Sequence, residues 1–384
     1  MRIVLLHAYS SRNAGDGLLV DESVALLLRL GVRRKDIHLV ALDPNSFRDT
    51  PLPVTGVLGA ADPFAEFYQL RRAGAALRGL LGLGPVRRLI EEADAVVAVG
   101  GGYLRSRTCW EGFTTLLAHG SQLRFAARSK SVTVYLPQSI GPLNGPIGAL
   151  LRRWLQDLGH VAVRDDRSLR EVPQAKRVPD LGLLRLARHA PEPQSGDGSV
   201  VLVARRLPAP RRYEHNLQAF TENLAASGRT VRMALQSSAG TRNDDRGFAL
   251  SLGLREPSVT LKERLASPAE VPSLVVSVRL HGCVQALMAG VPTIHLSYER
   301  KSIAAFEDLG LSEFVHHART FSPEGLAMQC RKLLRDPRDY WDRVAAALPG
   351  LGERGAAYER YVAQALGIAP TQPAGFTAMA RHVS

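Results

Sequence analysis

The sequence predicts an α/β protein with two Rossmann-like domains, and three observations support that expectation. Short apolar runs alternate with stretches of helical periodicity along the chain, which is typical of parallel sheets covered by helices. A length of 384 residues exceeds that of one typical domain. A segment rich in proline, glycine and polar residues, 189–198, interrupts the alternation, which then begins again. We therefore expect one domain over 1–188, a second over 199–350, and a C-terminal helix and tail over 351–384.

The composition excludes several classes of protein. Hydrophobic residues make up 45% of the chain, which is enough for ordinary globular cores, but no run reaches the ~18 uncharged apolar residues of a membrane helix. Too few residues precede the first expected strand to form a secretory signal. The 3 cysteines are odd in number and far apart, which argues against disulfides or a zinc site. We therefore expect a cytoplasmic protein without a bound metal.

The formal charge of +13 raises the question of a nucleic-acid partner. The arginines are scattered over every segment, and the aromatic residues, 6% of the chain, do not interleave with basic runs as a base-stacking surface would require. A nucleic-acid partner is therefore not expected. Anionic substrates, or an anionic membrane surface, fit the charge better.

The chain begins with an expected strand, Ile3–His7, then a polar loop and a helix from about Asp16 to Leu30. Asn13 and Asp16 suit helix capping, and Gly15 permits a tight turn. This strand–loop–helix order is typical of nucleotide-binding sheets, but the pattern G-x-G-x-x-G is missing from the loop, so a dinucleotide is not favoured. Asp16 is either only a helix cap or a carboxylate at the ligand edge of the sheet that binds or deprotonates a hydroxyl.

Three later strands of the first half end in residues that can meet a ligand, because parallel strands place their carboxyl ends at one edge of the sheet. After one buried run, Gly101 and Gly102 either let the backbone approach a ligand closely or form an ordinary packing turn. In the next loop, rigid and flanked by prolines, Gln138 and Ser139 either hydrogen-bond a ligand or only close the turn. Arg164 ends the third strand and adds a positive charge at that edge.

The other elements follow the same alternation. Strands are expected at 38–42, 54–58, 200–204 and 231–235, and helices at 66–83, 110–128, 146–158, 213–227, 323–334, 340–348 and 354–366. The last of these helices is expected to pack back on the first domain.

The stretch 277–301 contains the most specific chemistry. Arg279 and His281 lie at a turn between a buried strand and a helix that Gly290 and Pro292 end. A helix N-terminus favours an anion, and the planar fork of Arg279 matches a carboxylate or phosphate. His281 exchanges protons readily near neutral pH. Anion binding with proton transfer is therefore one interpretation, and an arginine that caps a neighbouring helix beside a core histidine is the other.

Several motifs occur together in one order: Asn13-Ala-Gly-Asp16, the Val-Gly-Gly-Gly run at 99–102, Pro137-Gln-Ser-Ile-Gly-Pro142, Val163-Arg-Asp165 with Ser168, Pro179-Asp180, and Arg279-Leu-His-Gly282 with Gly290-Val-Pro292 and Lys301. Over roughly residues 1–310 this set resembles the polysaccharide pyruvyl transferase family. The resemblance implies a glycosyltransferase-B-like fold, with two Rossmann-like domains facing across a cleft. It also implies transfer of pyruvate from phosphoenolpyruvate to a sugar, glycan or lipid-linked acceptor, with ketal formation and no cofactor.

The resemblance also implies roles for individual residues. Arg279, Leu280 and His281 match a motif for donor binding and acid/base work, and Arg164 matches a second contact to the anionic donor. We expect His281 to donate the proton and Asp16 to contact the acceptor or act as the base. The other residues expected to bind substrates are Asn13, Gly15, Gly101, Gly102, Gln138, Ser139 and Lys301. Peripheral membrane contact, at the inner membrane surface, follows if the acceptor is lipid-linked.

Two alternatives stay open on the sequence alone. One is a sugar-nucleotide glycosyltransferase of the same architecture, for which Glu299 is a candidate acidic residue, although the region 281–301 lacks an acidic pair for a ribose. The other is a binding module that has kept the fold and lost the chemistry. The retained Arg279, Leu280 and His281 argue against it, because the fold alone does not require these three residue types.

Overall fold

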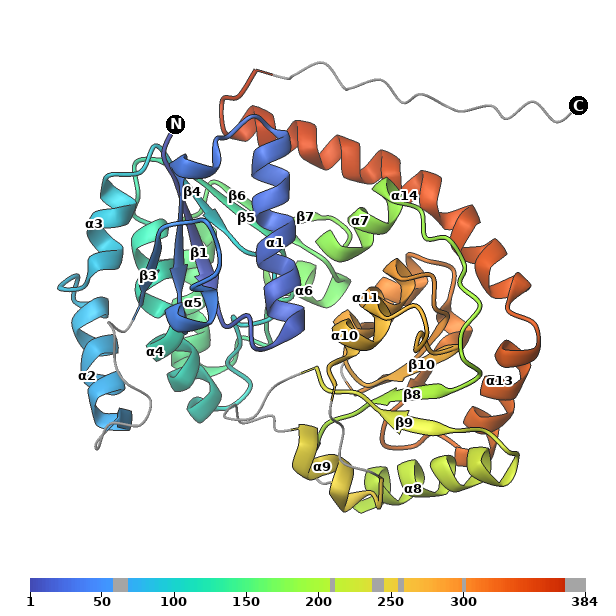
Figure 1. Cartoon of the computed structure of the whole chain (residues 1–384). Coiled ribbons are helices and arrows are strands. Elements are labelled where there is room, and N and C mark those ends of the chain that lie inside the picture. The colour runs from blue at the N-terminus through green and yellow to red at the C-terminus, as the bar shows by residue number, and fades with distance from the viewer. Residues whose placement is uncertain (58–67, 208–210, 237–244, 255–258, 299–301, 370–384) are drawn as a thin grey trace, which may run out of the picture.

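The computed structural model describes residues 1–57, 68–207, 211–236, 245–254, 259–298 and 302–369. Lys301 and Glu299 lie outside these ranges. The expectation of an α/β fold with two Rossmann-like domains is confirmed, because the described strands form two parallel sheets with helices packed on their faces (Figure 1). The limits of the domains at 188, 199 and 350 stay a prediction.

The first sheet has seven strands in the order β3-β2-β1-β4-β5-β6-β7. Their bounds are β1 (Ile3–Ala8), β2 (Ile37–Ala41), β3 (Val54–Gly56), β4 (Ala95–Ala98), β5 (Val132–Gln138), β6 (His160–Val163) and β7 (Lys176–Arg177). The helices of this half are α1 (Ala14–Arg29), α2 (Tyr68–Leu80), α3 (Pro85–Glu91), α4 (Cys109–Ala126), α5 (Gly145–Gln156), α6 (Asp166–Glu171) and α7 (Leu181–Arg188), with short 3₁₀ turns at Arg34–Asp36 and Pro44–Phe47.

Both faces of this sheet are covered, which explains why β1 and β4 are buried over their whole length. Side chains alternate along β1: Ile3 and Leu5 pack with α1 and α7, whereas Val4 and Leu6 pack with α3, α4 and α5. The carboxyl ends of the strands therefore form an edge between two helical layers, as expected for a ligand site.

The second sheet has five strands in the order β12-β11-β10-β8-β9. Their bounds are β8 (Val200–Val203), β9 (Val231–Met233), β10 (Leu274–Ser277), β11 (Thr293–Ser297) and β12 (Val315–His317). The helices are α8 (Arg211–Ala226), α9 (Asp245–Ser251), α10 (Leu261–Ala266), α11 (Leu280–Met288), α12 (Ile303–Glu307) and α13 (Pro323–Arg335), with a 3₁₀ turn at Ser312–Phe314. The largest core cluster lies under α8, α9, α13 and one side of α11.

The C-terminal region is one helix, so the expectation of two separate helices at 340–348 and 354–366 was wrong. α14 (Arg338–Ala365) runs for 28 residues with Pro349 inside it. A proline removes one helical hydrogen bond, but packing at both ends outweighs that loss. Val344 and Leu351 lie in the core of the second sheet, and Tyr358 lies in the core of the first, so α14 spans both (Figure 1).

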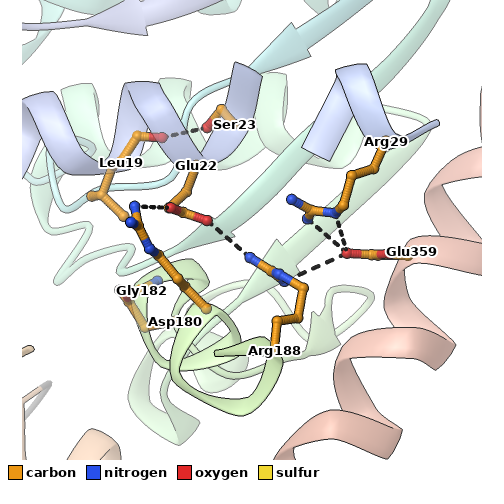
Figure 2. Close-up of polar contacts among 9 residues, drawn as sticks. Leu19, Glu22, Ser23, Arg29, Asp180, Gly182, Arg188 and Glu359 are labelled. Atoms are coloured by element: carbon orange, nitrogen blue, oxygen red, sulfur yellow. Dashed lines mark hydrogen bonds and ion pairs between the residues drawn. The ribbon is translucent and has the colours of Figure 1, made fainter. Parts of the chain in front are cut away.

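A cluster of charges connects α1, α7 and α14 (Figure 2). The side chain of Glu22 is only 4% exposed and accepts hydrogen bonds from Arg185 at 2.8 Å and Arg188 at 2.9 Å. Glu359 pairs with Arg29 at 2.7 Å and with Arg188 at 3.5 Å. Since Arg188 contacts both carboxylates, this network fixes α14 against the first domain.

We expect Glu22→Gln to lower the stability by about 1–2 kcal/mol, because it leaves two arginines facing a neutral amide and both are partly solvated. The melting temperature should fall by roughly 4 °C, measured by circular dichroism. The matched control is Glu91→Gln, which removes an exposed partner of Arg87 and should change the melting temperature much less. Equal shifts in the two variants would show that the cluster contributes no more than a surface ion pair.

Candidate active site

The N-termini of two helices, one from each domain, meet at the candidate site. β10 ends at Ser277, whose hydroxyl donates to the carbonyl of Arg279 at 2.8 Å and accepts from its N–H at 3.1 Å. α11 begins directly after this turn, with Arg279 as its N-cap residue. From the first domain, the N–H of Ala14, the first residue of α1, donates to the carbonyl of Gln236 at 3.2 Å. This bond joins α1 to the loop after β9, and Gly15 of α1 lies against His281 in the first turn of α11.

His281 lies at this contact. Its Nε2 is 3.7 Å from Oδ2 of Asp180, which is within ion-pair range but longer than a hydrogen bond. On the other side of the ring, a Cβ atom added to Gly15 would lie only 2.7 Å from Nδ1. Glycine at position 15 is therefore required for the imidazole to fit between α1 and α7.

Asp180 caps α7, and it connects the two domains electrostatically. Its Oδ1 accepts from the N–H of Gly182 at 2.8 Å, and its Oδ2 pairs with Nη1 of Arg164. Burial alone would raise the pKa of Asp180, but the charges of Arg164 and His281 and the hydrogen bond from Arg164 outweigh it and hold the pKa well below its usual range. Asp180 is thus a buried, ionised carboxylate beside His281.

Arg164 and Ser139 belong to the same buried network. Nε of Arg164 donates to the hydroxyl of Ser139 at 2.9 Å, and that hydroxyl donates to Asp165 at 2.6 Å. Asp165 in turn caps α6 by accepting from the N–H of Ser168 at 2.9 Å. Two of the nitrogen atoms of Arg164 therefore bind protein groups. The expected contact of Arg164 with a donor anion stays a prediction.

Arg279 is the N-cap of α11, and its side chain is only 9% exposed. Its Nη2 donates to Asp245 at 2.7 Å, and the same carboxylate accepts from the N–H of Gln236. Nε of Arg279 is buried and has no hydrogen-bond partner among the described residues. A buried N–H donor without a partner is costly, and a bound anion would satisfy it. Leu280, next in the chain, packs into the core of the second domain.

Asn13 and Asp16 form the first turn of α1. Oδ1 of Asn13 accepts from the N–H of Gly15 at 3.2 Å, and Nδ2 donates to the Asp16 carboxylate at 2.9 Å. Asp16 is half-buried. The cap itself is made by Asn13, so the interpretation of Asp16 as merely the N-cap does not describe the structure. Its carboxylate follows directly after Gly15, which contacts His281.

Gly101 and Gln138 connect the ends of β4 and β5. They pair in an isolated bridge, the carbonyl of Gly101 accepts from the N–H of Ser139 at 2.6 Å, and the amide of Gln138 donates to Val99 at 3.4 Å. A Cβ atom on Gly101 would lie 2.9 Å from the Tyr103 ring, so a packing reason for this glycine is present. Gly102 follows, half-buried. These contacts stabilise the loop, and its contact with a substrate stays a prediction.

Two carboxylates at the centre of the site were not among the predicted residues. Asp180 occurs in the Pro179-Asp180 motif that carried the family resemblance, so a signal for it was present. Asp245 is the first residue of α9, and its contact with Arg279 depends on how α9 packs.

His7 was not among the residues predicted from the sequence either. It has a left-handed backbone conformation, with φ of 69°, at the end of the central strand. Its ring lies 3.2 Å from Nδ1 of His119 and 3.0 Å from the Tyr135 hydroxyl, and it stacks on Tyr103. Burial, and then the neighbouring His119, lower the pKa of His7 far below the usual value, and burial lowers the pKa of His119 to about 3. Both histidines are therefore neutral at physiological pH.

Comparison with known proteins identifies the family. The model of the family described as "Polysaccharide pyruvyl transferase" matches residues 13–300, which is most of the chain. The chain belongs to the polysaccharide pyruvyl transferase family. No curated protein matches it at the significance that we required. Of the motif residues, His281 of the second domain lies against Gly15 and faces Asp180 of the first domain.

Solved structures agree with the family's expected fold. A putative UDP-N-acetylglucosamine 2-epimerase from Listeria monocytogenes is 11% identical, with 96% of this chain and 97% of that chain covered and a TM-score of 0.57. Os79 from O. sativa, in complex with UDP, is 13% identical, with coverages of 95% and 100% and a TM-score of 0.58. At such low identity the likeness shows the fold alone, and it confirms the glycosyltransferase-B-like architecture of this pyruvyl transferase family member.

The described part of the chain contains no group of three or more histidine, cysteine, aspartate or glutamate side chains placed to hold a metal ion. The site is instead built from two arginines, each paired with an aspartate, and one histidine.

We expect Asp180→Asn to lower the stability at pH 7 by about 3–5 kcal/mol, because it leaves the buried Arg164 without a counter-charge, while asparagine can still cap α7. Because the pKa of Asp180 is lower in the folded protein than in the unfolded chain, its ionised form stabilises the fold above about pH 4, the ordinary pKa of a carboxyl group. This stabilisation is lost as the pH falls below that value. The difference in melting temperature between wild type and variant should therefore shrink from about pH 5 to pH 3.

The control for this pH series is Asp166→Asn, since the side chain of Asp166 is 76% exposed. Its melting-temperature difference should be small and constant over the same range. A difference for Asp180→Asn that does not change with pH would contradict a depressed pKa at this carboxylate.

Proposed function

We propose that this protein transfers the pyruvate unit of phosphoenolpyruvate to two hydroxyls of a sugar or glycan, forming a ketal and releasing phosphate. The observation that carries this proposal is the N-terminus of α11, where a buried Arg279 N–H lacks a partner beside a histidine that faces an ionised aspartate. This arrangement supplies an anion site and a proton donor within one helical turn. The cysteine usage of the sequence fits a cytoplasmic location.

The donor carries a carboxylate and a phosphate, and both suit this place. The first N–H groups of α11 point out of the helix with a partial positive charge, and Nε of Arg279 adds a charged donor. Asp245 offsets part of the charge of Arg279 and also fixes the guanidinium, so that Nε keeps one direction. We assign the donor anion to this pair of groups.

His281 is the proposed acid. It gives its proton to the methylene carbon of the donor, and the electron pair of the carbon–carbon double bond forms the new C–H bond. The adjacent ketal carbon becomes oxocarbenium-like. The Asp180 carboxylate, 3.7 Å from Nε2, provides a counter-charge for the protonated ring before the transfer.

The acceptor completes the reaction in two additions. A sugar hydroxyl attacks the ketal carbon and loses its proton, for which the half-buried Asp16 is the proposed base. The bond between the ketal carbon and the phosphate oxygen then breaks, and phosphate leaves with the bonding electrons. A second hydroxyl adds and loses its proton, which closes the ring. One proton enters the new methyl group and one leaves with phosphate, so the two hydroxyl protons are accounted for.

Arg164 contributes mainly through Asp180 in this proposal. Its ion pair with Asp180 keeps that carboxylate ionised and in place beside His281, and Ser139 holds the guanidinium from the other side. Arg164 is then a positioning residue, although it was predicted to contact the donor. The Gly101 and Gln138 loop supports the same edge from β4 and β5.

A sugar-nucleotide glycosyltransferase is the second candidate, because structural relatives include one in complex with UDP and an epimerase from Neisseria meningitidis bound to UDP-GlcNAc. Calorimetry separates the two. Saturable binding of phosphoenolpyruvate without binding of UDP or UDP-sugars supports the pyruvyl transferase. The opposite pattern would support the glycosyltransferase and overturn the proposal.

We expect His281→Asn to lower the rate of phosphate release from phosphoenolpyruvate by about 10²–10⁴-fold, because the acid is removed. Binding of phosphoenolpyruvate should change little, since Arg279 and the helix N-terminus remain. The assay measures phosphate and the added pyruvyl mass on candidate glycans. His317→Asn, on an exposed histidine, is the control. Unchanged phosphate release in His281→Asn, with wild-type binding, would exclude this residue as the acid.

We expect Gly15→Ala to reduce kcat/KM for phosphate release by about 10²-fold, because the new Cβ would lie 2.7 Å from Nδ1 and must displace the ring. Gly17→Ala is a matched control on the same helix, where the nearest atom would be 3.5 Å away. That control should keep full activity with equal or higher stability. Equal activity in the two alanine variants would show that the position of His281 against α1 is not needed.

A further inference from the structure

Three large apolar side chains are exposed together where α2 ends. Leu77, Leu81 and Leu83 are 57%, 62% and 68% exposed. Leu77 and Leu81 lie one helical turn apart, so they project from the same side of the chain. Single exposed apolar residues are normal on a protein surface, but three within seven positions are unusual.

This segment is fixed rather than loosely attached. Nη1 of Arg124 on α4 donates to the carbonyl of Leu80, and a Cβ atom at Gly79 would lie 3.5 Å from the side chain of Ser121. The C-terminal part of α2 therefore packs on α4 through its small residues. The exposed leucines are directed by that packing to the outer side of the helical layer.

The same layer exposes two aromatic rings. Trp110 and Phe113, in the first turn of α4, are 67% and 42% exposed, and their ring centroids are 5.9 Å apart. Phe113 and Gly120 differ by seven positions and so lie on one face of α4. Gly120 meets Leu80 of α2. The two rings therefore lie on the side of α4 against which α2 packs. They are roughly 10 Å from Gly120 along the helix axis, toward the N-terminus of α4.

Positive charge accompanies these apolar groups. The sequence from Tyr68 to Ile90 contains five arginines and no acidic residue. Arg78 and Arg88 are exposed, and so is Arg87, which pairs with Glu91 in the next turn. Apolar side chains flanked by arginines match the boundary between the headgroups and acyl chains of an anionic bilayer. We call the outer surface of the first domain the set of Leu77, Leu81, Leu83, Trp110, Phe113, Arg78, Arg87 and Arg88.

We propose that this outer surface docks the protein on an anionic membrane. In Figure 1, α2 and α3 form the side of the first domain that faces away from the second domain, so docking leaves the contact between the domains uncovered. No helix among the described residues has the length and hydrophobicity to cross a bilayer, and the docking is peripheral. That the membrane carries a lipid-linked acceptor rests on the proposed function, whereas the docking does not.

A second copy of the chain is a less suitable occupant. A two-fold interface uses the same patch on both subunits, so it would place the arginines of one copy against those of the other. Like charges facing each other across an interface are unfavourable. Anionic lipid instead offers complementary charge to every arginine of the outer surface.

The test is sedimentation of the full chain with vesicles of phosphatidylcholine, with or without phosphatidylglycerol, in the absence of donor and acceptor. We expect binding only to the anionic vesicles, weakened by salt. Leu81→Ser with Leu83→Ser should reduce the binding constant by about tenfold or more, because two apolar side chains no longer enter the bilayer. Arg87→Ala with Arg88→Ala should reduce both the binding and its salt dependence.

The matched control is Leu250→Ser with Met328→Ser, since these side chains are 56% and 64% exposed on the second domain. This variant should bind the vesicles as wild type does, and melting curves must show that both double variants are folded. Equal binding to neutral and anionic vesicles, or wild-type binding by Leu81→Ser with Leu83→Ser, would overturn the proposal. A dimer that these serines dissociate, without vesicle binding, would assign the surface to a second copy. Because no donor is present, the result is independent of the proposed function.

Discussion

The structure depends on one buried carboxylate. Asp180 caps α7, pairs with Arg164 from the first sheet, and faces His281 from the second domain. Each contact alone is common in proteins, but one carboxylate in all three roles links the stability of the first domain to the position of a histidine on the other. A buried carboxylate needs a counter-charge, and Arg164 supplies it, so the arginine and the histidine are not independent of each other.

The contact between α1 and α11 adds a steric constraint to this electrostatic one. Gly15 leaves room for the imidazole, and the N–H of Ala14 donates across the domains to Gln236. Two helix N-termini that approach each other repel through their partial positive charges. An anion between them would relieve that repulsion, as the Asp180 carboxylate beside His281 does in part. The geometry thus favours anionic ligands before any individual contact with them is considered.

The sequence predicted the parts of this picture that depend on local patterns. Alternation of buried strands and helices gave two parallel sheets, and the strand-to-helix turn at Arg279 and His281 was recognised from periodicity and from Gly290. The pairing of Arg279 with Asp245, and of His281 with Asp180, was not predicted, because it depends on how segments distant in the chain pack. α14 was expected as two helices, whereas packing against both cores, which no local pattern reveals, keeps it continuous through Pro349.

His7 illustrates a different limit of the sequence. Its left-handed backbone coincides with a register irregularity in the pairing of β1 with β2, after Leu5, and its N–H donates to the side chain of Gln122 at 2.7 Å rather than to a neighbouring strand. A non-glycine residue in this region is strained, and the surrounding contacts must compensate for it. The stacking of His7 on Tyr103, which follows the glycine run, transfers that constraint to the loop at the edge of the sheet. The strain at His7 therefore constrains the loop after β4, in which Gly101 and Gly102 were predicted to meet a ligand.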